Sequence, residues 1–170
     1  MKNNIDGVLV VEGASDVAFL SRYINAIFFI TNGYDISNKK IEFLSRVSRV
    51  NKIVLMTDPD DAGQVIENKI KNKICGVFVA KIAKNTRKSY KKSGVAESDI
   101  KEVIETLNPY FTKEEPFSQN YDLNTLISLD KNPSEKRCEI VLKFGLLGGN
   151  NKAIENQLRM LKITREELWK

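Results

Sequence analysis

Acidic residues follow two of the apolar runs in this sequence, and their types and spacing could support metal-ion chemistry. Glu12 comes directly after the run at residues 8–11, and Asp58 comes directly after the run at residues 53–57. Asp60 lies two residues further on, after a proline that restricts the turn. Three carboxylates brought together would repel one another unless a divalent cation neutralised them. Hard oxygen ligands favour Mg²⁺ or Mn²⁺, which can orient a phosphodiester, stabilise its transition state and supply a hydroxide nucleophile.

The residue inventory excludes several other chemistries. The 170 residues contain no histidine, which removes imidazole general bases and the common zinc ligand sets. Cys75 and Cys138 lie far apart in apolar surroundings, so two buried thiols are expected, with a disulfide or a metal pair as alternatives. No apolar run approaches the ~20 residues that span a bilayer, and the first residues do not resemble a signal peptide.

Strands that alternate with helices would bring the acids together. Aliphatic and β-branched runs predict strands at residues 8–11, 28–31, 53–57 and 77–79. Apolar residues at helical spacing predict helices at four places: Val17, Leu20, Ile24 and Ile27; Ile41, Leu44 and Val47; Ala62, Ile66, Ile70 and Ile74; and Ile100, Val103, Ile104 and Leu107. This alternation predicts an α/β fold with a mainly parallel four-stranded sheet flanked by helices. If the first and third strands are neighbours, their carboxyl ends bring Glu12, Asp58 and Asp60 to one edge.

The last third of the chain has a different pattern. Apolar residues recur there at helical spacing without a convincing strand, which predicts a small all-α domain at residues 121–170. The polar segment at residues 111–120, which contains Pro116, is expected to be a linker. The α/β domain is therefore assigned to residues 1–110.

The net charge of +5 comes mainly from one stretch of the sequence. Residues 81–92 carry six basic side chains and no acidic ones: Lys81, Lys84, Arg87, Lys88, Lys91 and Lys92. A basic stretch that includes an aromatic residue, here Tyr90, suits the phosphate backbone of a nucleic acid. The alternative is a solvated loop without a binding role.

Two motifs in the α/β half resemble the Toprim signature of bacterial primases, topoisomerases and small nucleases: Val10-Val11-Glu12-Gly13 with Asp16, and Thr57-Asp58-Pro59-Asp60 with Gly63. Further motifs extend this to a resemblance to the ribonuclease M5 family from about residue 7 to the end: Thr31-Asn32-Gly33, Gly94-Val95, and the runs at residues 149–152 and 163–168. The sequence departs from the family pattern at Ala14, where lysine is common, and at Gln64, where glutamate is common.

This resemblance implies a magnesium-dependent endoribonuclease that cleaves double-stranded precursor 5S ribosomal RNA. It also implies a bacterial cytoplasm and a helper, a ribosomal protein of the L18 family that binds 5S rRNA. One or two Mg²⁺ ions, with Mn²⁺ as an alternative, are expected on Glu12, Asp58 and Asp60, and Glu12 acts either as a ligand or as a general acid or base. Four nearby residues are expected to support these catalytic acids: Asp16, Asn32, Gly33 and Gly63.

RNA contacts are expected from the basic stretch and from the helical domain. Duplex RNA is recognised mainly by its shape and phosphates, which residues 81–92 could contact. The basic excess of residues 121–170 is slight, and the candidate contacts there are Lys136, Arg137, Lys143, Lys152 and Arg165. Packing onto the α/β domain is the competing role for the helical domain.

Two other functions stay open for this sequence. A Toprim nuclease could act on DNA, although a topoisomerase needs a nucleophilic tyrosine in a partner domain, which this chain is too short to hold in its usual form. A non-catalytic Toprim module could bind nucleic acid without cutting it. Each acid taken singly also has a simpler explanation, as a strand-end residue or a helix cap. The clustering argues against a pure binding module, because repulsion between the acids costs stability.

Overall fold

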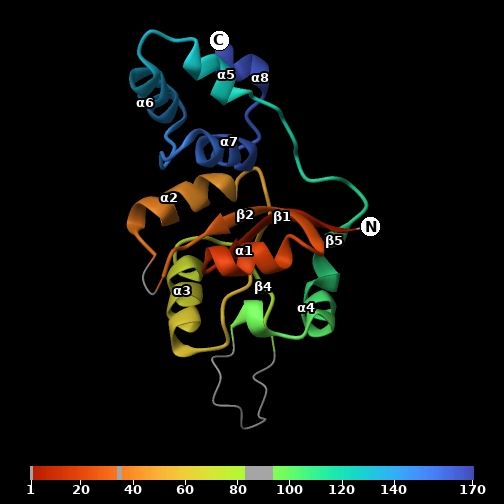
Figure 1. Ribbon diagram of the computed structural model, residues 1–170. Helices are drawn as coiled ribbons and strands as arrows, with labels where there is room; N and C mark the ends of the chain where they lie inside the picture. The colour runs from red at the N-terminus through yellow and green to blue at the C-terminus, as the bar shows by residue number, and fades with distance from the viewer. Residues whose placement is uncertain (1, 34–35, 83–93) are drawn as a thin grey trace. The chain divides into compact units, whose positions relative to one another are not determined.

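The structure is a computed structural model that describes residues 2–33, 36–82 and 94–170 (Figure 1). The chain falls into two compact units, Met1–Pro116 and Phe117–Lys170. The boundary between them lies within the predicted linker, residues 111–120, but the first two linker residues form a short strand.

The first unit is built on a sheet whose main path is β2-β1-β3-β4. The four strands, β1 (Asn3–Val11), β2 (Ile24–Ile30), β3 (Ile53–Leu55) and β4 (Phe78–Val79), pair in parallel. This confirms the predicted α/β fold with a mainly parallel sheet, although the sheet has five strands rather than the expected four. A fifth strand, β5 (Phe111–Thr112), pairs antiparallel with the beginning of β1, and the polar sequence around it gave no strand signal.

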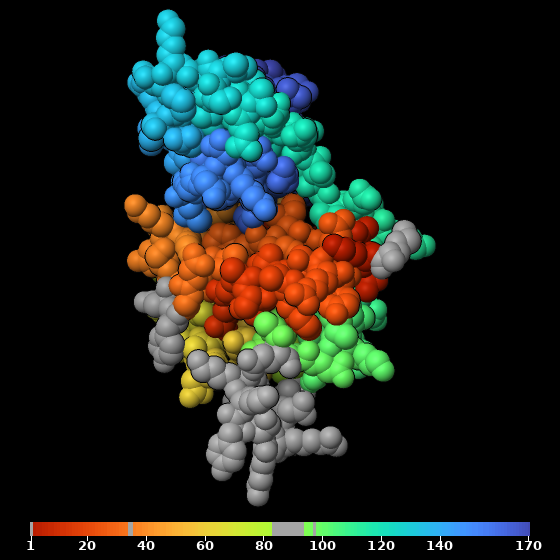
Figure 2. Space-filling model, in the orientation of Figure 1, coloured from red at the N-terminus to blue at the C-terminus, as the bar shows by residue number. Residues whose placement is uncertain are grey.

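Helices cover both faces of this sheet. They are α1 (Ala14–Leu20), α2 (Asn38–Val47), α3 (Asp61–Lys71) and α4 (Ile100–Leu107), with the short turns η1 (Val95–Glu97) and η2 (Asn108–Tyr110). Leu9 and Val11 of β1 pack in one core with Leu20 of α1 and Val103 of α4. α1, in orange-red, and α4, in green, form neighbouring parts of the surface (Figure 2). On the opposite face Phe29 of β2 stacks on Phe43 of α2, with ring centroids 6.2 Å apart.

Two sequence-based expectations about local structure are wrong. The first helix ends at Leu20, and Ile24 and Ile27 belong to β2, because residues 24–30 pair in parallel with β1 instead of continuing the helical stripe. Cys75 and Cys138 are exposed free thiols rather than buried ones. Cys75 lies in the turn after α3, and Cys138 lies on an exposed part of helix α6.

The second unit consists of helices α5 (Leu123–Ser128), α6 (Pro133–Phe144), α7 (Asn151–Met160) and α8 (Arg165–Trp169). Tyr121 is fully buried in it and donates a hydrogen bond of 2.5 Å to the carbonyl oxygen of Ile163. The side chain of Gln157 binds the loop before α7, through the amide of Leu147 at 2.6 Å and the carbonyl of Gly148 at 2.8 Å. These contacts make the predicted small all-α part a packed unit.

No helix within the described residues has the length and apolar character needed to cross a membrane.

Candidate active site at the carboxyl edge of the sheet

The predicted acids meet because β1 and β3 are neighbours in the sheet. Val8 and Val10 of β1 lie opposite Ile53 and Leu55 of β3 in parallel register. Both strands therefore end at the same edge, where Glu12 follows β1. One oxygen of Glu12, Oε1, accepts a hydrogen bond of 2.7 Å from the backbone amide of Asp58. The structure thus brings Glu12 directly onto the turn that carries the other two acids.

The two aspartates of that turn are each held by a backbone amide. Oδ1 of Asp58 accepts a 2.7 Å hydrogen bond from the amide of Val95, at the start of η1. Oδ1 of Asp60 accepts a 2.8 Å hydrogen bond from the amide of Gly63 and caps the N-terminus of α3. Since a cap of this type fixes its side chain against the first turn, the position of Asp60 is coupled to the start of the helix.

Glu12 is affected by burial and by its acidic neighbours. Burial raises the pKa of Glu12 from its usual 4.5 to about 7; the hydrogen bond from the Asp58 amide lowers it, and the negative charges of Asp58, Asp60 and Asp16 raise it. Asp16 is itself 5% exposed and accepts a 2.9 Å hydrogen bond from the amide of Gly13. The predicted supporting role of Asp16 is therefore structural and electrostatic in this geometry, because it caps α1 and adds negative charge near Glu12.

The carboxylate side chains at this edge suit a hard divalent cation, although they do not form a complete coordination shell. Within residues 2–33, 36–82 and 94–170, no group of three or more acidic or cysteine side chains is arranged to hold a metal ion. Carboxylate oxygens are the ligands that Mg²⁺ and Mn²⁺ prefer, and a cation would relieve the excess negative charge around Glu12. Mg²⁺ commonly uses one or two carboxylates and completes its shell with water and substrate phosphate. Glu12, Asp58 and Asp60 could therefore act as partial metal ligands.

Two glycines allow the chain to approach the acids closely. A Cβ atom at Gly63 would lie 2.2 Å from the carbonyl oxygen of Asp58 and 2.8 Å from Oε1 of Glu12. A Cβ atom at Gly94 would lie 3.2 Å from Oδ2 of Asp58 and 3.3 Å from its Oδ1. Gly63 was a candidate from the sequence, whereas the amide of Val95 that follows Gly94 was not. Gly94-Val95 is one of the motifs of the resemblance, but the sequence assigned it no contact with Asp58, because that contact is made by the main chain.

Asn32, another predicted supporting residue, contacts the site through its backbone. The amide of Asn32 donates a 3.0 Å hydrogen bond to the carbonyl oxygen of Glu12. Asn32 and Gly33 have φ angles of 59° and 101°, so both lie in the left-handed region that turns the chain away after β2. The amide of Asn32 therefore holds the main chain at Glu12, and Gly33 continues the turn that follows β2.

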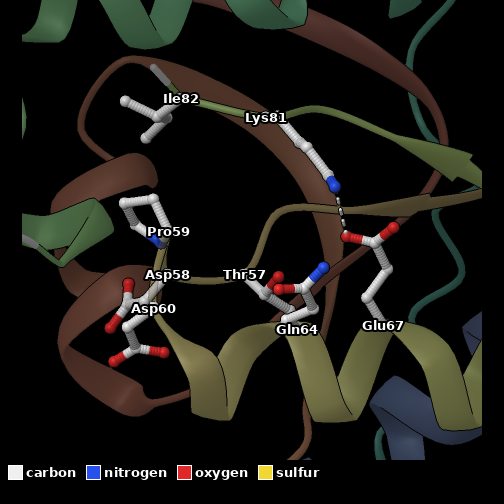
Figure 3. A pocket seen from close by; sticks show the side chains of 8 residues that line it. All are labelled: Thr57, Asp58, Pro59, Asp60, Gln64, Glu67, Lys81 and Ile82. Atoms are coloured by element: carbon white, nitrogen blue, oxygen red, sulfur yellow. Dashed lines mark ion pairs between the residues drawn. The ribbon is translucent and has the colours of Figure 1, made fainter. Parts of the chain in front are cut away.

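A cavity of about 310 Å³ lies beside the Asp58–Asp60 turn (Figure 3). It is lined by Thr57, Asp58, Pro59, Asp60, Gln64, Glu67, Lys81 and Ile82. The sequence did not single out Glu67. Its spacing from Asp60 could have indicated it. Glu67 follows Asp60 by seven residues, which is two helical turns, and so lies on the same side of α3.

The predicted RNA contacts fall into three groups. Lys81 lines the cavity and forms an ion pair of 3.1 Å with Glu67. Five lie outside the described residues: Lys84, Arg87, Lys88, Lys91 and Lys92. Five lie in the second unit: Lys136, Arg137, Lys143, Lys152 and Arg165. Among the last group, Lys136 pairs with Glu139 at 2.8 Å, and Lys143 binds the carbonyls of Glu167 and Leu168, so these two have structural partners.

Comparison with known proteins defines the class to which this geometry belongs. The family model of the Toprim domain matches residues 7–97, which is more than half of the chain. The chain therefore belongs to the Toprim family. A solved structure, the small TOPRIM domain protein from Bacillus stearothermophilus, has the same fold, with a TM-score of 0.54 and 22% identity over 63% of this chain and 90% of that one.

Relatives that span both units narrow the class further. Ribonuclease M5 of Mycoplasma genitalium is 28% identical over 167 residues, which are 98% of this chain and 94% of that protein. Ribonuclease M5 of Clostridium botulinum is 26% identical over 170 residues, again 98% of this chain and 94% of that protein. The resemblance to ribonuclease M5 is therefore confirmed, and the chain is an enzyme of the Toprim family related to it.

Proposed function

We propose that this protein is a magnesium-dependent endoribonuclease that trims double-stranded precursor 5S ribosomal RNA in a bacterial cytoplasm. One observation carries the proposal: Glu12 binds the amide of Asp58 at the edge where Asp60 begins α3. The relatives that cover nearly the whole chain and carry the name ribonuclease M5 support RNA as the substrate.

In this proposal two of the acids bind the cation, and the third transfers a proton. Asp58 and Asp60 bind the metal, because backbone amides hold both carboxylates at the edge of the sheet. When bound, the metal supplies a Lewis acid for the scissile phosphate and makes a hydroxide nucleophile accessible. Burial raises the pKa of Glu12 to about 7, so this residue can hold or release a proton near neutral pH. We therefore assign Glu12 the general acid or base role, with metal ligation as its alternative.

The described residues on either side of residues 83–93 support an RNA backbone as the ligand. Lys81, at the beginning of the stretch, lines the cavity that also contains Asp58 and Asp60. Gly94, just beyond its end, lies against the carboxylate of Asp58. Lys81 and Gly94 therefore both lie at the acidic edge, where a phosphate strand must be bound for cleavage.

The helical unit is proposed to recognise the RNA together with a ribosomal protein of the L18 family. Lys152 and Arg165 are exposed there and suit phosphate contacts.

The substrate is tested by incubating the protein with precursor 5S rRNA, with and without Mg²⁺ and the ribosomal protein, beside duplex DNA of the same sequence. The expected result is that the protein cleaves the RNA but not the DNA, and only when Mg²⁺ is present. Cleavage of DNA at a comparable rate would favour the DNA nuclease instead. Equal RNA binding in a chelator, with no cleavage under any condition, would identify a non-catalytic binding module.

Replacing the basic stretch should weaken RNA binding and reduce its dependence on salt. With Lys84, Arg87, Lys88, Lys91 and Lys92 changed together to alanine, fewer counterions are released when RNA binds. The slope of log affinity against log salt should fall by roughly 0.7–0.9 for each phosphate that the protein no longer neutralises. Titration of duplex RNA at several KCl concentrations measures this slope. An unchanged slope would mean that the stretch is a solvated loop.

Alanine at the two close-approach glycines should give graded losses of cleavage. Gly63→Ala forces a Cβ atom against the main chain of Asp58, so both activity and thermal stability should fall strongly. Gly94→Ala requires a shift of only a few tenths of an ångström in the carboxylate of Asp58, so roughly 10-fold slower cleavage with near-normal stability is expected. Single-turnover rates and thermal melts distinguish the two variants. Full activity in both would contradict the position given to Asp58.

A further inference from the structure

Glu67 is a buried acid that the proposed reaction does not use. Its side chain lies on α3 and is only 6% exposed. Its two oxygens hold two lysines: Oε1 binds Lys71 at 3.2 Å, and Oε2 binds Lys81 at 3.1 Å. A buried carboxylate is costly unless it is paired, so two cationic partners explain how it is tolerated. They do not explain why an acid lies at this position.

The two lysines differ in what else they can reach. Lys71 lies one turn further along α3 and does not belong to the residues that line the cavity. Lys81 comes from the segment after β4 and lines the cavity. The Lys81 side chain is 64% exposed, and an ammonium group carries three N–H donors, more than Oε2 of Glu67 can take. Lys81 can therefore bind a further ligand while Glu67 holds it.

The cavity has acidic side chains at one end and an ion pair at the other. Figure 3 shows Asp58 and Asp60 on one side and the Lys81–Glu67 ion pair on the other, with Thr57 and Gln64 between them. Its volume of about 310 Å³ is at the lower end of the range for small-ligand sites, ~300–1,000 Å³. An anionic group bound at Lys81 would lie in the same cavity as the acids that are proposed to hold the metal.

We infer that this cavity is a subsite for a phosphate of the substrate strand next to the scissile one. Lys81 is the phosphate ligand, and Glu67 is a positioning residue that holds the Lys81 ammonium in the cavity. The inference rests on the proposed function, because a neighbouring phosphate exists only if the substrate is a nucleic acid.

Lys71 provides a matched control, because it shares the same carboxylate without lining the cavity. The full-length variants are Lys81→Met, Lys81→Arg, Lys71→Met, Glu67→Gln and the double variant that combines Lys81→Met with Glu67→Gln. Methionine removes the charge and keeps an unbranched apolar stem, and each lysine variant leaves Glu67 with one ion pair. Binding of precursor 5S rRNA is measured in a chelator at several KCl concentrations, and kcat and KM are measured in Mg²⁺.

Lys81→Met should lower the salt slope by roughly 0.7–0.9, the value for one phosphate contact, and should raise KM more than it lowers kcat. Lys71→Met should leave the slope and KM unchanged. Glu67→Gln should raise KM in the wild-type background and have little further effect when Lys81 is already methionine, because it acts through Lys81. Lys81→Arg, which keeps the positive charge, should retain the wild-type slope.

Equal slopes and equal KM values for the Lys81 and Lys71 variants would overturn the inference and leave a structural ion pair. Additive effects of the Glu67 and Lys81 changes would overturn the positioning role of Glu67. The proposed function fails separately, if the wild-type protein cuts no RNA in Mg²⁺. Even then, the slope of log RNA affinity against log salt, measured in a chelator, shows whether Lys81 binds a phosphate.

Discussion

Asp58→Asn and Asp60→Asn should each slow RNA cleavage by roughly 1,000-fold or more, because each removes a negative charge that holds the metal. The loss of several kcal/mol of transition-state stabilisation corresponds to a factor of this size. Asparagine keeps the oxygen that accepts the Val95 amide at residue 58 and the Gly63 amide at residue 60. Asn is also as good a helix cap as Asp, so α3 should still form. RNA binding should survive or improve, since a negative charge facing phosphate is removed.

Single-turnover cleavage of precursor 5S rRNA measures this effect, and thermal melts verify that the variants are folded. The matched control is Asp61→Asn. Asp61 is an exposed acid in the first turn of α3, next to Asp60, and it does not line the cavity. It should retain nearly full activity. Wild-type turnover in either the Asp58 or the Asp60 variant would refute the assignment of these acids.

Glu12→Gln should abolish cleavage and yet stabilise the metal-free protein at alkaline pH. Burial raises the pKa of Glu12 from 4.5 to about 7, so the folded protein binds this proton more tightly than the unfolded chain does. Stability is therefore lost as the pH rises from about 4.5 through 7, and the ionised group destabilises the fold above that range. Glutamine can still accept the hydrogen bond from the Asp58 amide, but it carries no charge.

The measurement is the melting temperature of both proteins from pH 4 to pH 8 in a chelator. Near pH 4 the two values should agree, and at pH 8 the variant should melt roughly 2–4 °C higher, an effect reduced by the partial exposure of the site. Added Mg²⁺ should raise the melting temperature of the wild type and narrow this difference. A constant difference between the proteins at every pH would show that Glu12 does not titrate as described.

The part of the site that the sequence predicts is the part carried by side chains at strand ends. Val8 to Val11 form a continuous apolar run and are fully buried, so the acid that follows them has to lie at the edge of the sheet. The sequence could not predict that β1 and β3 are adjacent strands, because strand order is set by the packing of the whole unit. Once that order is known, the contact of Glu12 with Asp58 follows from the parallel register.

The errors and omissions have physical causes. Ile24 and Ile27 are three residues apart, which fits a helix, but pairing with β1 outweighs this local periodicity. β5 has two residues and forms because the beginning of β1 offers it a backbone partner. The amide of Val95 and the ion pairs of Glu67 depend on segments distant in the sequence, and no local pattern specifies them.

The most direct test of the proposed metal site is the single-turnover rate of precursor 5S rRNA cleavage as a function of Mg²⁺ concentration. The rate of the wild-type protein should be zero in EDTA, rise to saturation with Mg²⁺ and recover when Mn²⁺ is supplied instead. Asp60→Asn should stay near zero at every metal concentration while still binding the RNA. Full-rate cleavage by the wild type in EDTA, or a wild-type rate for Asp60→Asn at saturating Mg²⁺, would contradict cleavage by a metal held at this carboxylate edge.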